Sequence, residues 1–353
     1  MALFSTHNVS VKGLSIAVPD KIYYNKDYDF IPESERDLFI KTTGVVQRRM
    51  AVIGRTASDL CVAAAEELLK KLNWSKESVE LLIFVSQTRD YVLPSMSCIT
   101  QDRLGLSKNC MAFDINLGCS GYVYGLSVIS SMMSSGAFKR ALLLAGDIST
   151  INTAYTDKST FPLFGDAGTA TAVEFSPGNT WYFNLQTDGS GHEAIIIRDA
   201  GARNHGSPAS FDMIEYGEGI IHNRLQVELH GMEVFNFSLK EVAPNFKELM
   251  DYAGKKTEDT DYFIFHQANK LINESIRKKL KLPPEKVPMC IDEFGNTSSS
   301  SIPLAMLSRI SGDLYAKKNK LVLCGFGVGL SWGTMYFENE PFVCLPLIEV
   351  PNP

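Results

Sequence analysis

The second half of this chain repeats the order of structural elements expected in its first half. Apolar runs typical of buried strands alternate with helical patterns, as they do in parallel α/β units. In the first half we expect helices at 58–72, from about 94, and at 119–135, with strands at 81–87, 111–116 and 141–147. In the second half we expect helices at 232–252, 269–280 and 299–310, with strands at 262–267, 287–292 and 320–326. Ser58 occupies the position of an N-cap for the first helix.

The spacing between matching elements is nearly constant. Gln87 and Gln267 end matching strands 180 residues apart, and Leu142 and Leu321 lie 179 residues apart. Such a period is far too long for a solenoid. Chance similarity among α/β segments is the alternative, but it does not explain why both order and spacing are kept. The chain is therefore predicted to be a duplicated α/β protein with halves at 1–177 and 178–353.

Duplication brings polar residues from distant parts of the chain to one place. Ligands bind at the carboxyl ends of parallel strands. Cys119 follows one such strand, and His266 ends another at the position that matches Ser86. Asn296 precedes the helix that mirrors the one expected to begin at Cys119. We therefore expect Cys119, His266 and Asn296 to meet.

Composition excludes several classes of protein. The 353 residues are 45% hydrophobic, and a net charge of −6 argues against general nucleic-acid binding. The longest apolar runs are too short to span a bilayer, and the first residues do not have the pattern of a signal peptide. Seven cysteines without paired or zinc-type spacing predict reduced thiols, a cytoplasmic location and no metal site. The basic run 277–279 with Lys281 fits either a solvated helix face or a patch for an acidic carrier protein.

Cys119 is the candidate nucleophile. It lies in the segment INLGCSGYVYGL, where a strand passes through a glycine turn into a helix of small residues. The positive end of a helix dipole favours the thiolate, although an unpaired cysteine is more often a buried structural residue. Taken singly, His266 fits a buried core histidine and Asn296 fits a turn or capping residue. Only their expected meeting with Cys119 makes both of them candidates for catalysis.

Two glycine-rich turns accompany these residues. The segment 325–329 (GFGVG) closes a strand and either presents backbone N–H groups to an oxyanion or forms a tight bend between core strands. It does not fit a dinucleotide-binding fingerprint, since no helix plainly follows it. In the segment 164–168 (FGDAG) we expect a structural role, with Asp166 accepting hydrogen bonds from backbone amides.

The motifs together resemble those of β-ketoacyl-acyl-carrier-protein synthase III and related thiolase-fold condensing enzymes, across essentially the full length. The segments that carry the resemblance are TGVVQRR (43–49), LGCSGYVYGL (117–126), FGDAG (164–168), HQAN (266–269), FGNTSSSSIP (294–303) and GFGVGLSWG (325–333). A Cys/His/Asn set is similar to the synthase III or chalcone-synthase branch, whereas elongating ketosynthases use two histidines and degradative thiolases a second cysteine. The resemblance implies a five-layered αβαβα fold.

The resemblance also implies a two-stage reaction. Cys119 accepts an acyl group from a thioester, with backbone N–H groups of Cys119 and of the turn at Gly327 and Val328 holding the oxyanion. Malonyl-carrier protein or malonyl-CoA then loses CO₂, and His266 and Asn296 stabilise the enolate that attacks the acyl group. Neither a metal nor an organic cofactor is implied, because the substrates are thioesters of CoA or of carrier-protein phosphopantetheine. An acyl-carrier protein and a second copy of the chain, in a homodimer, are the implied partners.

Substrate contacts depart from the family pattern. Leu38 and Thr42 stand where the family has a Trp and an Arg that contact the CoA nucleotide. Further positions that the resemblance assigns to substrate are Leu93 (usually a bulky aromatic), Lys158 (usually Arg), Phe164, Gly231, Met232 (usually Asn), Asn269 and Lys270, next to Leu271 in place of Arg. These changes indicate a specialised paralogue with a different acyl substrate. Two other functions stay open: acyl transfer to a hydroxyl or amine, and a non-catalytic partner subunit.

Overall fold

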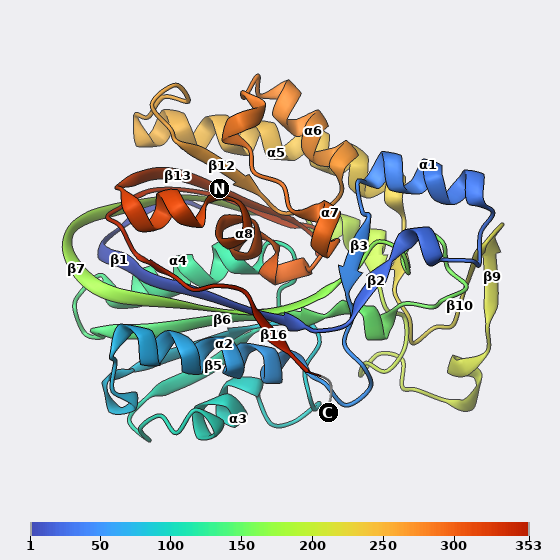
Figure 1. Cartoon of the computed structure of the whole chain (residues 1–353), viewed down its shortest axis with the longest axis horizontal. Helices are drawn as coiled ribbons and strands as arrows, with labels where there is room; N and C mark the ends of the chain where they lie inside the picture. The colour runs from blue at the N-terminus through green and yellow to red at the C-terminus, as the bar shows by residue number, and fades with distance from the viewer. Residues whose placement is uncertain (1, 352–353) are drawn as a thin grey trace.

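The computed structural model describes residues 2–351 and is organised around two long antiparallel strands (Figure 1). β1 (Ala2–Pro19) pairs along most of its length with β7 (Asp166–Thr187). On its other edge, the first part of β7 pairs with β6 (Arg140–Ile148), and the last part pairs with β14 (Ser331–Asn339). The sheet order is β12-β13-β14-β7-β6-β4-β5. The predicted boundary at 177/178 falls where β7 changes partner, and the division into two halves stays a prediction.

The remaining elements have the following bounds. The other strands are β2 (Ile22–Tyr24), β3 (Gln47–Arg49), β4 (Leu81–Val85), β5 (Met111–Ile115), β8 (Ile195–Ile196), β9 (Ile214–Gly217), β10 (Ile220–His222), β11 (Glu228–Leu229), β12 (Tyr262–Phe265), β13 (Asn319–Gly327), β15 (Val343–Cys344) and β16 (Ile348–Val350). The α-helices are α1 (Glu33–Thr43), α2 (Ala57–Leu72), α3 (Met96–Arg103), α4 (Gly121–Met133), α5 (Gly231–Ala253), α6 (Lys270–Lys279), α7 (Ile291–Phe294) and α8 (Ser301–Ala316). Short 3-10 helices include η3 (Ser149–Asn152) and η7 (Ser298–Ser300).

The elements stack in five layers, as predicted. In Figure 1, α5 and α6 lie above the strands of the second half, α4 and α8 lie between the two groups of strands, and α2 and α3 lie below. One apolar core surrounds α4 and α8. A second lies between α2 and the strands it covers, and a third lies between α5 and the strands it covers. α4 carries no charged residue, as expected for a helix covered by strands on both sides. This central layer places the starts of α4 and α8 side by side at the carboxyl ends of the strands.

Three local predictions were wrong. The N-cap of α2 is Thr56, which forms a capping box with Asp59, while Ser58 is buried and bonds to Asp90. The segment 287–292 is no strand among the described residues: the Cys290 N–H donates to the side-chain Oε1 of Gln267 at 3.0 Å, and α7 follows. The serine run forms η7, so α8 begins at 301 rather than 299 and continues to 316 instead of 310.

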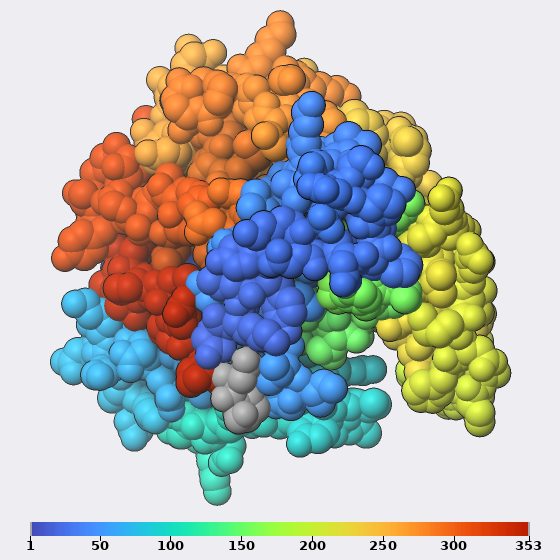
Figure 2. Space-filling view, turned by 45° about the vertical axis from the view of Figure 1, so that its right-hand side comes forward, coloured from blue at the N-terminus to red at the C-terminus, as the bar shows by residue number. Residues whose placement is uncertain are grey.

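A hairpin of β9 and β10 stands apart from the layered body. In Figure 2 the segment that carries it forms a separate ridge at the right-hand side, beside the loop that follows β6. The hairpin is attached to that loop by backbone bonds, including Lys158 N–H to Gly219 O at 2.9 Å. Among residues 2–351, no helix has the length and apolar character needed to cross a membrane.

Candidate active site

Cys119 lies in the turn between β5 and α4, at the carboxyl end of a parallel strand. Its side chain is only 8% exposed. The Gly121 N–H donates to the Gly118 carbonyl at 2.7 Å, which closes the turn. A Cβ on Gly121 would stand 2.4 Å from Val85 Cγ1, so only glycine allows this close approach to β4. The turn presents the thiol at the carboxyl end of β5.

The thiol of Cys119 is protonated at neutral pH. Burial raises its pKa to about 12, and the negative charge of Asp147 adds to the rise. Hydrogen bonds from the backbone of Val328, from the Ser298 side chain and from the backbone of Cys119 lower the pKa in turn, but less. We expected the start of the helix to favour a thiolate. α4 instead begins two residues later, at Gly121, and desolvation dominates.

Asn296 is held by both its backbone and its side-chain oxygen. Its N–H donates to the Leu163 carbonyl and its carbonyl accepts from the Gly165 N–H, both at 3.0 Å. Its Oδ1 accepts the Ser298 N–H at 2.9 Å. Within the described residues its Nδ2 makes no hydrogen bond, and the side chain is nearly buried. The amide therefore keeps two N–H donors for a substrate oxygen.

His266 directly follows β12 and is buried, with its Nδ1 2.7 Å from the Ser301 Oγ. That oxygen also accepts the Gln267 N–H at 3.4 Å, and its own proton can be donated to Nδ1. A hydroxyl that donates to Nδ1 leaves the ring proton on Nε2. Burial lowers the pKa of His266 to about 3, against the opposing effect of a bond to the Ser298 backbone. The ring is thus a neutral hydrogen-bond donor.

Ser298 contacts all three predicted residues. Its N–H donates to Asn296, its side chain hydrogen-bonds to Cys119, and its backbone hydrogen-bonds to His266. Its φ of 52° places it in the left-handed region, which serine rarely adopts, so the surrounding contacts must hold it there. The structure thus brings Cys119, His266 and Asn296 together around one residue.

Sequence reasoning missed Ser298, Ser301 and Asp147 as parts of the site. The only signals were a serine run after Asn296 and an acidic residue at the end of an apolar strand. Neither pattern identifies a role, because serine runs and strand-end aspartates are common in turns.

The turn after β13 lies directly on the nucleophile. A Cβ on Gly327 would stand 2.7 Å from Cys119 Cβ and 2.9 Å from its Sγ. The backbone of Val328 hydrogen-bonds to the sulfur. The Val328 side chain turns toward Gly118, where a Cβ would meet its Cγ1 at 3.0 Å. An N–H group therefore lies beside the nucleophilic sulfur, close to where the oxygen of an attacked thioester would come.

Asp166 has the structural role predicted for it. Its carboxylate accepts from the Ala51 N–H at 2.8 Å and from the Thr150 N–H and Oγ1 at 3.1 and 2.5 Å. Burial raises its pKa to about 6 despite these bonds. The same glycine turn supports Asn296, since a Cβ on Gly165 would stand 2.1 Å from the Phe294 carbonyl oxygen.

Comparison with known proteins assigns the family. Residues 113–189 match the family model 3-oxoacyl-(acyl-carrier-protein) synthase III, and residues 250–339 match the model of its C-terminal part. Beta-ketoacyl-(acyl-carrier-protein) synthase III 1 of Bacillus cereus is 31% identical over 330 residues, covering 93% of this chain and 98% of that protein. The chain belongs to the 3-oxoacyl-(acyl-carrier-protein) synthase III family. Its members are acyl-transferring condensing enzymes.

Further relatives agree along the whole chain. The synthase III of Chlamydia caviae is 32% identical over 338 residues, covering 95% of this chain and 98% of its own. The crystal structure of a 3-oxoacyl-(acyl-carrier-protein) synthase from Burkholderia xenovorans LB400 superposes with a TM-score of 0.93 at 37% identity, covering 99% of both chains. The thiolase fold and the family predicted from the sequence are confirmed.

The residues predicted to contact substrate in this family member occupy varied surroundings. Leu93 and Met232 are 83% and 72% exposed, and Gly231, at the start of α5, is also exposed. Lys158 is paired with Glu35 of α1, Nζ to Oε2 at 3.0 Å. Phe164 forms a backbone bridge with Asn296, so its position is tied to the catalytic loop.

Two predicted substrate residues begin α6. Asn269 is the N-cap, and its Oδ1 accepts the Ile272 N–H at 2.8 Å. Lys270 packs on α1, because a Cβ on Gly44 would stand 2.8 Å from the Lys270 Cβ. The substrate roles of all these residues stay predictions.

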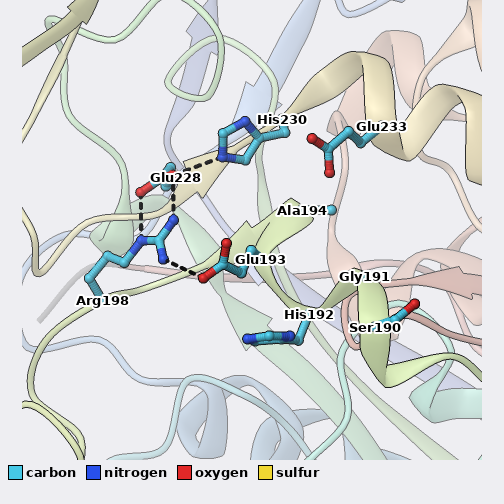
Figure 3. Close-up of a pocket in the computed structure, with 9 residues that line it drawn as sticks. All are labelled: Ser190, Gly191, His192, Glu193, Ala194, Arg198, Glu228, His230 and Glu233. Carbon is cyan, nitrogen blue, oxygen red and sulfur yellow. Dashed lines mark hydrogen bonds and ion pairs between the residues drawn. The ribbon is translucent and has the colours of Figure 1, made fainter.

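A charged pocket of about 290 Å³ lies near the start of α5 (Figure 3). Arg198 is paired there with Glu228 and Glu193, and His230 also bonds to Glu228 (Figure 3). The pocket contains none of the three predicted catalytic residues. Its Gly191 packs on Leu330, which follows the turn that touches Cys119.

Proposed function

We propose that this chain transfers an acyl group from a thioester to Cys119 and condenses it with a malonyl thioester. The products are a β-ketoacyl thioester, CO₂ and the free thiol of the acyl donor. The observation that carries the proposal is the meeting of Cys119, His266 and Asn296 around Ser298, with the backbone of Val328 against the sulfur. The family supports the same reaction.

The first stage is acylation of Cys119. The sulfur attacks the thioester carbon, and the thiol proton leaves with the departing thiol of CoA or of the carrier. Backbone N–H groups of Val328 and Cys119 hold the oxyanion of the tetrahedral intermediate. Because the resulting acyl-cysteine is neutral, the buried site that disfavours a thiolate does not disfavour the acyl-enzyme.

The second stage needs donors for a developing enolate. Loss of CO₂ from the malonyl thioester places negative charge on its thioester oxygen. The free Nδ2 of Asn296 and the Nε2–H of His266 stabilise that charge without being charged themselves. The carbanion attacks the acyl carbon, the C–S bond to Cys119 breaks, and the sulfur leaves as a thiolate that takes a proton from water. No step requires a metal or an organic cofactor.

The test measures CO₂ and product together. Incubation with an acyl-CoA panel and malonyl-carrier protein should release CO₂ in equal amount to the β-ketoacyl thioester formed. Acyl transfer to a hydroxyl or amine without CO₂ would instead establish the alternative acyltransferase function.

We propose that two copies of the chain form a homodimer through β5. This strand is the last in the sheet order, and Met111 at its start is 48% exposed. The nearby loop exposes Tyr91, Val92 and Leu93 by 63%, 72% and 83%. An exposed edge strand beside exposed apolar side chains fits a surface covered by a partner. In such a dimer Leu93 would reach the partner's acyl site.

An acyl-carrier protein is the proposed donor of the malonyl group. The relatives are named for that carrier, and α6 begins next to the site and carries a basic end. Arg277 is paired with Glu274, and Lys279 Nζ donates to the Leu239 carbonyl. Among the described residues of this basic run and the start of α6, Lys270, Lys278 and Lys281 are then the candidates for contact with an acidic carrier. The seven free cysteines fit a reducing cytoplasmic location.

We also propose a priming substrate other than acetyl-CoA. Leu38 is 63% exposed on α1 without an aromatic ring to stack on a base, and Lys158 is neutralised by Glu35. The acyl-CoA panel tests this directly, because strict preference for acetyl-CoA would contradict it.

A further inference from the structure

Asp147 is a buried carboxylate that joins the two halves of the chain. It ends the apolar part of β6 and is 1% exposed. Its Oδ1 accepts from the end of β4, and its Oδ2 accepts from the serine turn that follows Asn296. The five donors are Gln87 N–H at 2.8 Å, Ser86 Oγ at 3.1 Å, Thr88 Oγ1 at 3.3 Å, Ser299 Oγ at 2.7 Å and Ser299 N–H at 3.1 Å.

Among the described residues, all the hydrogen-bond donors to Asp147 are neutral and it takes part in no ion pair. A buried charge held only by neutral donors is costly compared with an apolar side chain of similar size. Asp166 shows a contrast: it is equally buried, and burial raises its pKa, but the positive charge of Arg48 is one of the groups that offset part of that rise. Asp147 is therefore poorly explained by stability alone.

Asp147 hydrogen-bonds to Ser299, which directly follows Ser298, the residue that contacts the three predicted catalytic residues. Ser299 is fixed through both its N–H and its hydroxyl. Its neighbour Ser298 has the left-handed backbone and contacts Cys119, His266 and Asn296. Gln87, bonded to the other oxygen, packs on Gly118, where a Cβ would stand 2.4 Å from its Oε1. The Asp147 carboxylate thus holds Gln87, which packs next to Cys119 on Gly118, and also Ser299, which follows Ser298.

We propose that Asp147 is a positioning residue of the condensation reaction, which holds the Ser298 turn against Cys119 by clamping Ser299 to the end of β4. This inference rests on the proposed function. A misplacement of about 1 Å at a reacting group can lower the rate about 100-fold, so loss of the clamp is expected to reduce kcat more than it changes KM.

The charge of Asp147 gives the proposal a second, independent readout. Asp147 is the charged group that raises the pKa of the Cys119 thiol, after burial itself. The other groups that act on the thiol within the described residues are hydrogen-bond donors of Val328, Ser298 and Cys119, and His266 after β12 is neutral because burial lowers its pKa. Removing the charge should therefore make the thiol ionise at lower pH even while condensation slows.

The experiment compares Asp147→Asn with Asp166→Asn as a matched control. For each protein, kcat and KM for condensation are measured, together with the rate of Cys119 alkylation by iodoacetamide between pH 6 and 10. Asp147→Asn should lower kcat by 10-fold or more with KM within about 3-fold, and should move the alkylation profile to lower pH. Asp166→Asn should leave the alkylation profile where the wild type has it, because Asp166 does not act on the thiol.

Wild-type kcat together with an unshifted alkylation profile in Asp147→Asn would overturn the proposal. If that variant fails to fold, Ser299→Ala tests the clamp with the carboxylate kept: it should lower kcat without moving the profile to lower pH, and wild-type kcat would overturn the proposal. The alkylation arm needs no acyl substrate. A failure of the proposed condensation function would therefore be seen separately, as absence of CO₂ release from the wild type.

Discussion

Gly327 lies so close to Cys119 that a methyl group on its Cα would stand 2.9 Å from the sulfur. The turn that contains it also supplies the backbone of Val328 as a hydrogen-bond partner of the thiol. The nucleophile that follows β5 is thus enclosed by the glycine that ends β13.

Gly327→Ala should abolish acylation of Cys119, with a loss of at least about 100-fold, because the added methyl group displaces the sulfur from its N–H donors. The measurement is the rate of acyl-enzyme formation from an acyl-CoA. Gly312→Ala is the control, since nothing lies within 4 Å of the Cβ it adds on α8. An acylation rate in Gly327→Ala equal to that of Gly312→Ala would contradict the assignment of this turn.

The pH dependence of thiol reactivity follows from burial. With a pKa of about 12, Cys119 is protonated throughout the neutral range and its thiolate fraction rises tenfold for each pH unit up to pH 10. Alkylation of the free protein by iodoacetamide should therefore keep rising from pH 7 to pH 10. The measurement follows modification of Cys119 by peptide mass spectrometry. A plateau below pH 8 would show instead a thiolate stabilised in the resting protein.

Asn296→Asp should separate the two stages of the reaction. The change keeps an oxygen for the Ser298 N–H but replaces the free N–H₂ with an acceptor that repels the enolate. Decarboxylation of the malonyl thioester should fall about 100- to 1000-fold, the size expected for loss of one oxyanion donor. Acylation of Cys119 should change less than 10-fold and serves as the internal control. Equal losses in both stages would remove Asn296 from its proposed role.

Much of this arrangement was predictable from the sequence because it depends on element order. Strands and helices recur at a constant spacing, and parallel strands end on one edge, so Cys119, His266 and Asn296 were expected to meet. The contacts that hold them were not predictable. Ser298 adopts a left-handed backbone that nothing in a run of serines indicates, and Asp147 forms its bonds across 152 residues of chain.

The start of the helix was expected to lower the pKa of the Cys119 thiol, but burial raises it. Sequence indicates that a helix follows Cys119, but desolvation depends on how many side chains cover the sulfur. The turn at Gly327, about 200 residues further along the chain, is one of the segments that cover it. The strand expected at 287–292 failed similarly, because the Cys290 N–H is taken by the Gln267 side chain rather than by a strand.

Leu93→Phe should shorten the range of acyl groups accepted. Leu93 is smaller than the aromatic residue that the family usually has at this position. If Leu93 of one copy reaches the acyl site of the other, the smaller side chain leaves room for longer or branched acyl groups. A phenylalanine would fill that room. The measurement is kcat/KM across a panel of acyl-CoA chain lengths, with Val92→Phe in the same exposed loop as the control. Identical chain-length profiles for the wild type and both variants would place Leu93 outside the acyl site.

The most direct test of the central claim is the intact mass of the protein after exposure to an acyl thioester. We expect one acyl group per chain, located on Cys119 by peptide mapping, absent from Cys119→Ala, and discharged as a β-ketoacyl product when malonyl-carrier protein is added. An adduct on another residue, or no adduct with any acyl donor of the panel, would contradict the account and favour a non-catalytic subunit.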